Sequence, residues 1–199
     1  MKHGNETNQI IGVALEHNGG ELARPFVEKA NATYPVLVDE EGLTSSRLGF
    51  KAVPNGVLVD EAGMICWEKY GGFSVENEED VEVVRRFFAG EEIEPRLQPE
   101  AAYELNDETV REIDALVQRG HELAASDQVA GAVEQWRRAL HKDPENLVIR
   151  KQIWAAEHPE KFHPTIDWDW QKVQLKQERE DEIAQGVCGP DGCPLPGFG

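Results

Sequence analysis

The sequence predicts an α/β domain followed by an all-α helical region and a flexible tail rich in glycine and proline. In the first 92 residues, short β-branched apolar runs alternate with apolar residues at helical spacing, which is typical of an α/β domain. After the acidic, proline-containing segment that follows, the apolar period is helical throughout. We therefore expect a domain over residues 1–92, a linker over 93–107, a helical hairpin with a third helix over 108–158, and a last helix with a cysteine-containing tail over 159–199.

Four strands are predicted, over residues 9–15, 34–38, 56–60 and 64–70. The first is almost continuously apolar, so we expect it to be buried on both faces of a parallel sheet. The last two are joined by a tight turn at residues 61–63, which indicates an antiparallel hairpin. Helices are expected after the first, second and fourth strands, with Pro25 in a first helical turn and Gly90 ending the last helix.

The charge is strongly negative, with 38 acidic residues against 20 lysines and arginines and a net charge of −18. Phosphate groups would be repelled by such a surface, so we expect no nucleic-acid partner. No apolar run approaches the roughly 20 residues that cross a bilayer, and the first nine residues lack the apolar segment of a secretion signal. We expect a cytoplasmic protein without a membrane partner.

Five short motifs follow the predicted elements of the α/β domain. They are V-A-L-E at 13–16, Y-P-V-L-V-D at 34–39, G-F-K-A-V-P at 49–54, G-V-L-V-D at 56–60 and E-A-G at 61–63. Together they resemble the redoxin branch of the thioredoxin superfamily, which contains thiol–disulfide oxidoreductases and proteins similar to alkyl hydroperoxide reductase. The resemblance covers about residues 9–90.

The resemblance implies a thioredoxin-like fold and a loop that faces the substrate or partner. The proline before the third core strand of that family is cis and faces the active-site cysteines, and Pro54 has the matching position. The loop is thus expected to comprise Val53, Pro54 and Asn55. The family usually has threonine where this chain has Asn55.

The family's first core strand and its C-x-x-C motif precede the strand matched by residues 9–15, and neither has a counterpart here. The expected fold is therefore thioredoxin-like but truncated at its N-terminal βα unit. Three explanations stay open: the chain continues upstream, another chain supplies the strand, or the strands at 9–15 and 56–60 close up directly. Whether the protein is an enzyme also stays open.

The helical region carries a pattern of small and aromatic residues that resembles one tetratricopeptide motif. Its residues are Gly120, Leu123, Ala132, Trp136, Ala139 and Pro144. Small residues let two antiparallel helices approach closely while Trp136 fills the space between them. Because one repeat cannot bury its own apolar face, we expect the hairpin to pack on residues 147–154 or on the α/β domain. A single copy favours a structural hairpin over a partner-binding array.

Cys188 and Cys193 are the candidate catalytic residues, because Pro-Asp-Gly between them forms turns and could bring the two thiols together. Three interpretations stay open: a redox pair that exchanges with a partner's disulfide, a two-thiolate site for a soft metal ion, or reduced thiols without function. Cys66, between Ile65 and Trp67 in a predicted strand, is expected to be a small core residue.

Other side chains are expected to be structural. His158 and His163 show no spacing typical of metal ligands, so we expect them in a loop. Trp168 and Trp170 are expected to dock the last helix on the rest of the molecule. The sequence predicts no cofactor and no metal site among these residues.

Two functions from different classes remain. The first is a redoxin-like protein associated with thiol–disulfide redox chemistry, in which any activity uses Cys188 and Cys193 or the thiols of a partner. The second is a non-catalytic protein–protein interaction or scaffold protein, since a fold without its catalytic residues does not carry the function. Both predict a protein partner, and homo-oligomerisation stays open.

Overall fold

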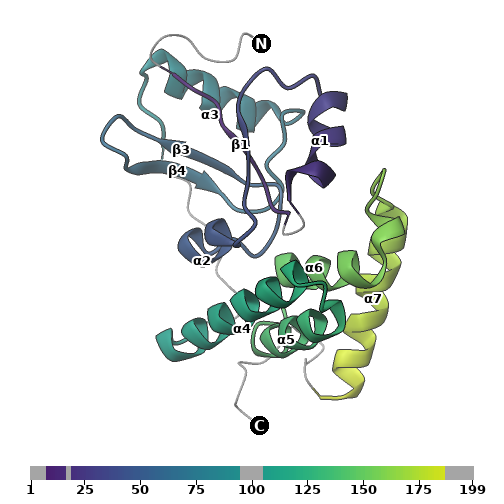
Figure 1. Cartoon of the computed structure of the whole chain (residues 1–199). Helices are drawn as coiled ribbons and strands as arrows, with labels where there is room; N and C mark the ends of the chain where they lie inside the picture. Colours follow the sequence, from purple (N-terminus) through teal and green to yellow (C-terminus); the bar gives the residue numbers. More distant parts are fainter. Residues whose placement is uncertain (1–7, 17–18, 95–104, 187–199) are drawn as a thin grey trace.

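The computed structural model describes residues 8–16, 19–94 and 105–186 and places them in two bodies (Figure 1). The α/β body comprises the described residues up to 94, and the helical body comprises residues 105–186. An α/β domain followed by a helical region is therefore confirmed. None of the helices within these ranges is long and apolar enough to cross a membrane.

The α/β body contains two separate two-stranded sheets. Strands β1 (Gly12–Ala14) and β2 (Val36–Val38) pair in parallel, and β3 (Gly56–Val59) and β4 (Ile65–Lys69) pair antiparallel. The predicted hairpin is confirmed. No ladder joins β1 to β3, so the explanation that these two strands close up directly is wrong for this structure.

The prediction that β1 is buried on both faces is also wrong. Ile11 and Val13 are 52% and 47% exposed. The reason is that β1 has one strand neighbour, and helix α1 (Gly20–Lys29) covers one face of this small sheet, where Gly20 lies beside Val38 of β2. The strand is consequently shorter than the apolar run that predicted it.

Pro25 lies in the second turn of α1, not in the first turn as predicted, because the helix begins at Gly20. A proline there removes the amide that would donate to the Glu21 carbonyl. Pro25 and Glu21 are both exposed, so water can satisfy that carbonyl. Helix α2 (Leu43–Leu48) is the helix expected after the second strand, and it ends at Gly49, whose φ of 70° is left-handed.

A buried ion pair fixes helix α3 (Glu78–Ala89) against the β3–β4 hairpin. The Asp80 carboxylate is 2% exposed and accepts two hydrogen bonds from Lys69 Nζ at 2.8 and 2.7 Å. It also accepts the Ser74 amide at 2.9 Å. A buried charge needs such partners, and here they join the strand, the loop and the helix. The helix ends at Gly90, as predicted.

The helical body consists of four α-helices and one short 3₁₀ helix. They are α4 (Asp107–Ala125), α5 (Val129–Lys142), α6 (Leu147–Glu157), η1 (Pro159–Lys161) and α7 (Trp168–Ala184). The α-helices agree with the sequence prediction, and η1 was not predicted. A contiguous cluster of buried hydrophobic side chains lies in this body, between α4, α5 and α6.

Helices α4 and α5 meet where Trp136 of α5 lies against the backbone of α4. Trp136 is completely buried, and its Nε1 donates to the Val117 carbonyl at 3.3 Å. A Cβ at Gly120 would lie 2.2 Å from that nitrogen. The prediction that small residues allow close approach around Trp136 is confirmed.

Helix α7 attaches to α6 through the guanidinium of Arg150, which is 1% exposed. It donates to Glu178 at 2.5 Å and Glu182 at 2.6 Å on α7, and to the Pro144 carbonyl at 2.9 Å. Trp154 Nε1 donates to Glu178 at 2.6 Å. The carboxylates of α7 therefore neutralise a cation buried in the helical body.

Lys51 joins the two bodies. Its Nζ lies 2.9 Å from Asp143, a carboxylate at the end of α5 that is 2% exposed, and its carbonyl accepts the Val148 amide of α6 at 3.1 Å. Asn146 also donates to Asp143, at 2.9 Å. The helical hairpin thus packs both on the third helix and on the α/β body, the two positions that the sequence left open.

Replacing Gly120 by alanine is expected to destabilise the protein by about 1–3 kcal/mol, because the added methyl group overpacks Trp136. Gly131→Ala is the matched control, since its Cβ would meet Leu123 at an ordinary 3.5 Å. That change should stabilise α5 by up to about 1 kcal/mol through helix propensity. Urea unfolding followed by circular dichroism measures both. Equal stability of the two variants would contradict this packing.

Candidate functional site

Of the residues predicted from sequence to be functional, the loop at residues 53–55 is described. Cys188 and Cys193 lie outside the described residues, as do most of the predicted linker and the tail. The site is therefore built from the loop and from the cavities between the two bodies.

The loop at residues 53–55 is held by the fold itself. The Val53–Pro54 peptide bond is cis, as the resemblance implies. Asn55 donates to the Ala52 carbonyl at 2.8 Å and accepts the Gly71 amide at 2.6 Å, while the Pro54 carbonyl accepts the Phe73 amide at 3.2 Å. The side chain of Asn55 therefore connects the loop to the segment after β4, so it serves the loop's own structure.

Val53 is the member of the loop that stays accessible. Its side chain is 41% exposed. Within the described part of the chain, neither its N–H nor its C=O has a backbone hydrogen-bond partner. The neighbouring carbonyls of Ala52 and Pro54 are both engaged. The loop thus presents one apolar side chain and one pair of backbone groups on a fixed support.

Val53 lies on the edge of an apolar cavity of about 300 Å³ between the two bodies. Apolar side chains from both bodies dominate its wall. They include Ala14, Leu22, Phe26, Val53, Phe162 and Ile166. A concave, mainly apolar site with a few polar groups at a domain interface is the usual form of a binding site.

Most polar groups of this apolar cavity lie on its helical side, and Glu16 lines it from the α/β body. Burial lowers the pKa of Lys151 below the ordinary value of a lysine, and its Nζ lies 5.3 Å from the ring of Trp168. His163 Nε2 lies 3.9 Å from a Glu16 carboxylate oxygen, and its ring packs on Phe26 at 6.0 Å. A ligand would meet a partly desolvated ammonium group beside aromatic rings.

A second cavity, of about 460 Å³, lies between α2 and the helices α4–α6. It is more polar than the first. Its polar lining includes Asp39, Ser45, Arg47, Asp114, Gln118 and His121. In Figure 1 the short helix α2 is the part of the α/β body that faces α4.

His121 is a partly buried imidazole in the wall of this polar cavity. Its ring packs edge-on against Trp136 at 5.7 Å, and a Cβ at Gly42 would lie 3.1 Å from its Cε1. Burial lowers the pKa of His121, while the Asp39 carboxylate and a hydrogen bond with the Glu41 backbone act in the opposite direction. The imidazole is therefore biased toward its neutral form.

Asp114 on the same helix has the opposite shift. Burial raises the pKa of Asp114, partly offset by the charge of Arg47. A histidine with a lowered pKa and a carboxyl group with a raised pKa in one cavity are the shifts often found at proton-transfer sites. Nothing in the sequence marks these residues, because their burial arises when α2 packs on α4.

Three structural predictions for other side chains have mixed outcomes. Cys66 is a partly buried free thiol that donates to the Leu58 carbonyl at 3.3 Å, which fits a structural role. Trp170 docks the last helix as predicted, packing on Trp154 at 5.7 Å and on His158 at 5.1 Å. For Trp168 the docking prediction is wrong in part, because this ring is 57% exposed.

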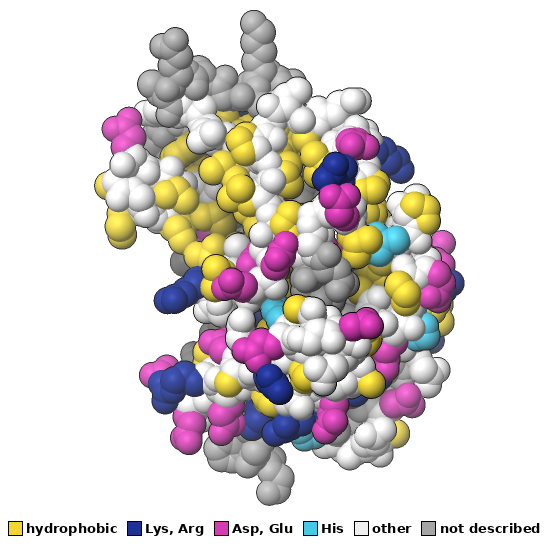
Figure 2. Space-filling model, viewed as in Figure 1, with side chains coloured by type: hydrophobic (Ala, Val, Ile, Leu, Met, Phe, Trp, Pro, Cys, Tyr) yellow, Lys and Arg dark blue, Asp and Glu magenta, His cyan; other side chains and the backbone are white. Residues whose placement is uncertain are grey.

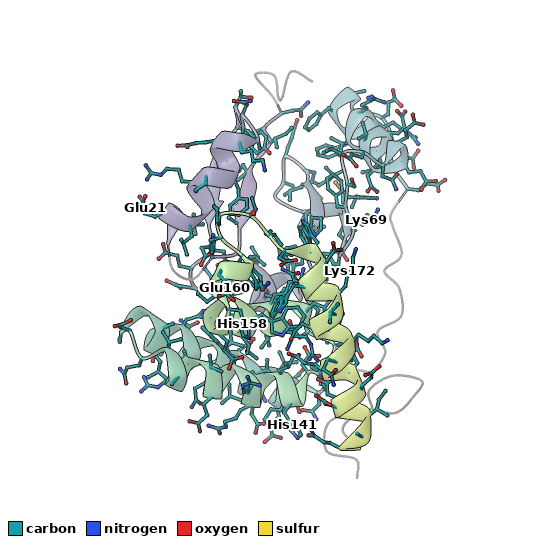
Figure 3. All side chains as sticks on the ribbon, turned by 90° about the vertical axis from the view of Figure 1, so that its right-hand side faces the viewer. Glu21, Lys69, His141, His158, Glu160 and Lys172 are labelled. Atoms are coloured by element: carbon teal, nitrogen blue, oxygen red, sulfur yellow. The ribbon has the colours of Figure 1, made fainter. Side chains whose placement is uncertain are left out.

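His158 and His163 lie outside the helices and strands, as predicted. His158 follows the end of α6, and His163 precedes a second cis proline bond. Figure 3 shows His158 near the junction of the two bodies, while His141 lies at the far end of the helical body. Across residues 8–16, 19–94 and 105–186, no group of three His, Cys, Asp or Glu residues is arranged to hold a metal ion.

Comparison with known proteins leaves the site to be interpreted from its own geometry. No protein-family model, no curated protein and no solved structure matches this chain.

We expect acidification to weaken the contact around His121. The unfolded imidazole binds a proton near pH 6.5, whereas the folded one binds it only at lower pH. The unfolded state therefore holds more protons below about pH 6.5, and the free energy of unfolding falls. Asp114 acts in the opposite direction at lower pH, because its folded pKa is raised.

Urea unfolding between pH 7.5 and 5.5 should therefore show a smaller loss of stability for His121→Gln than for the wild-type protein. His141→Gln, at an exposed position, is the control and should behave like the wild type. Parallel pH profiles for the wild type and His121→Gln would show that the burial of this imidazole is not linked to stability.

Proposed function

We propose that the protein is a thioredoxin-like member of the redoxin group that binds a partner polypeptide in thiol–disulfide redox chemistry. The partner would contact the loop at residues 53–55 and the apolar cavity beside it. The observation that carries this proposal is that Val53 is accessible and lines that cavity. The carbonyls of its neighbours, Ala52 and Pro54, both accept hydrogen bonds within the protein.

The chemistry of the loop suits a polypeptide better than a small polar substrate. An extended chain can hydrogen bond to the backbone groups of Val53 while it inserts an apolar side chain into the cavity. The wall is rich in aromatic and aliphatic side chains from both bodies, and such surfaces contribute most of the binding energy at protein interfaces. The hydrogen bonds of Asn55 keep the loop in place, which lowers the entropy lost on binding.

The redox part of the proposal rests on Cys188 and Cys193 or on the thiols of the partner. In an exchange, the thiolate of one cysteine would attack a disulfide of the partner and release one partner thiolate. The second cysteine would then resolve the mixed disulfide. Cys66 is unsuited to this role, because its thiol is partly buried in β4 and donates to a backbone carbonyl.

The second candidate is a scaffold protein without catalysis. It shares the binding loop and differs only in having no thiol chemistry. The observation that favours it is that Cys66, the cysteine within the described ranges, is partly buried and donates to a backbone carbonyl.

Binding at the loop predicts that Val53→Asp weakens the affinity for an unfolded polypeptide about tenfold, because a carboxylate would be desolvated at the edge of the cavity. The probe is fluorescein-labelled ribonuclease A, reduced and carboxamidomethylated, followed by anisotropy. Val75→Asp is the matched control, since Val75 is 72% exposed in the same body and does not line the cavity. Equal losses in the two variants would assign the effect to charge alone.

Thiol chemistry is tested by differential alkylation with intact-mass detection across a series of glutathione redox poises. If Cys188 and Cys193 form a redox pair, they should cycle reversibly within the cytosolic range. Cys188→Ser should then abolish disulfide reduction and leave the unfolding midpoint unchanged, while Cys66→Ser should keep the activity. If both thiols stay reduced at every redox poise, the thiol-exchange function is rejected and the scaffold function is the one that remains.

A further inference from the structure

We propose that the apolar cavity between the two bodies binds a carboxylate attached to an apolar group, and that Lys151 and Gln171 hold the carboxylate. Two sources have this chemistry: a free monocarboxylic acid, and the C-terminal residue of a partner polypeptide. The inference deepens the proposed function, because it concerns the same cavity. It rests on that function for the polypeptide source alone.

Lys151 of α6 lines this cavity without a counter-charge. Its Nζ lies 5.3 Å from the centre of the Trp168 ring, and no carboxylate oxygen in the described part of the chain lies within 4 Å of it. By contrast, Lys51 and Lys69 each reach a carboxylate, at 2.9 and 2.7 Å. Burial lowers the pKa of Lys151, as expected for a cation that loses water without gaining a counter-ion. A bound carboxylate would supply that counter-ion.

Gln171 of α7 is a second polar side chain of the cavity. It is only 6% exposed. Its backbone amide donates to the Asp167 carbonyl at 3.1 Å, but its side-chain amide makes no hydrogen bond to any residue that the structure describes. Buried polar groups are normally satisfied, so an amide of this kind in a cavity wall indicates a ligand that satisfies it. Its Nε2 group can donate to a carboxylate.

Trp168 brings these two polar groups to one part of the cavity. Trp168 and Gln171 are three residues apart on α7, so they lie on the same face of the helix, and both line the cavity. The Lys151 ammonium group lies over the Trp168 ring. The two donors thus come from α6 and α7 to the neighbourhood of one aromatic ring, which is where the carboxylate would lie.

The remaining wall suits an apolar group of limited size. A volume of about 300 Å³ is at the lower end of the range of ligand pockets. The apolar side chains around it include Leu22, Phe26, Val53, Phe162 and Ile166. A small inorganic anion would gain nothing from these side chains, and an uncharged apolar molecule would leave the ammonium group without a counter-ion. A ligand with both parts satisfies both kinds of wall.

The acidic groups of the protein favour a ligand with a single negative charge. Glu16 lines the cavity from the α/β body, and its carboxylate lies 3.9 Å from His163 Nε2. On the face shown in Figure 2, acidic side chains are spread over both bodies, and the chain has a net charge of −18. Such a surface repels anions. One carboxylate can be balanced by Lys151, whereas each further negative charge would meet repulsion.

Octanoate and octanamide test whether the carboxylate is recognised, because they share the apolar chain and differ in charge. Both are titrated into the wild-type full chain at pH 7, and binding is followed by ¹H–¹⁵N NMR. We expect octanoate to bind about tenfold more tightly than octanamide. Equal affinities, or no binding of octanoate, would overturn the proposal. This comparison needs no variant of the protein.

Variants assign the effect to the two donors. Lys151→Met removes the charge and should weaken octanoate about tenfold, with octanamide within about twofold of the wild type. Gln171→Leu should weaken octanoate about threefold. Lys172→Met is the matched control, because Lys172 (Figure 3) is exposed, does not line the cavity and carries the same charge. The proposal is wrong if Lys151→Met keeps the preference for octanoate or if Lys172→Met loses as much.

The peptide acetyl-Gly-Gly-Leu-Leu and its C-terminal amide distinguish the two sources. Binding that needs the free carboxylate assigns the site to a polypeptide C-terminus, whereas binding of octanoate alone assigns it to a free acid. If octanoate binding depends on Lys151 while Val53→Asp has no specific effect on the unfolded polypeptide, the proposed function fails and the carboxylate site stands. If the polypeptide binds through Val53 while octanoate and octanamide bind equally, this inference alone fails.

Discussion

Lys51 is the contact on which the arrangement of the molecule depends, because one residue joins the two bodies through both its side chain and its backbone. Its ammonium group neutralises the buried Asp143, and its carbonyl accepts a hydrogen bond from the Val148 amide in the first turn of α6. Both cavities lie between the bodies that this contact holds together. Val53 is only two residues further along the chain, so the position of the loop relative to the helical body is set by the same anchor. Breaking a buried ion pair is strongly destabilising, so an arrangement of the two bodies that separates Lys51 from Asp143 would be disfavoured.

The α/β body and the helical body are stabilised in different ways. The helical body has the contiguous hydrophobic cluster around Trp136, whereas the α/β body relies on the Lys69–Asp80 ion pair, a few buried side chains and contacts with its neighbour. Apolar residues that a larger sheet would bury remain accessible on β1 and β2. The loop at residues 53–55 belongs to this less complete body, so a ligand that binds only the folded form there would also stabilise that body.

Most of the architecture could be predicted because it follows from local rules. Periodicity located the third helix of the helical region, α6, and Gly90 located the end of α3. The pattern around Trp136 also predicted a contact between helices. Burial of β1 could not be predicted, since an apolar run does not reveal how many strands lie beside it. The shifted pKa values of His121 and Asp114 were equally hidden, because they arise from the approach of two bodies far apart in sequence.

Arg150 has a consequence for how the helical body can be divided. Its guanidinium is enclosed within the body and is balanced by Glu178 and Glu182 from α7. The carboxylates of α7 are therefore the counter-ions of Arg150, and the α4–α5–α6 unit alone would contain a buried cation without them. A minimal version of this body that omits α7 would also have to replace Arg150 by an uncharged side chain. The α4–α5 hairpin thus cannot be transplanted as a module with its third helix unchanged.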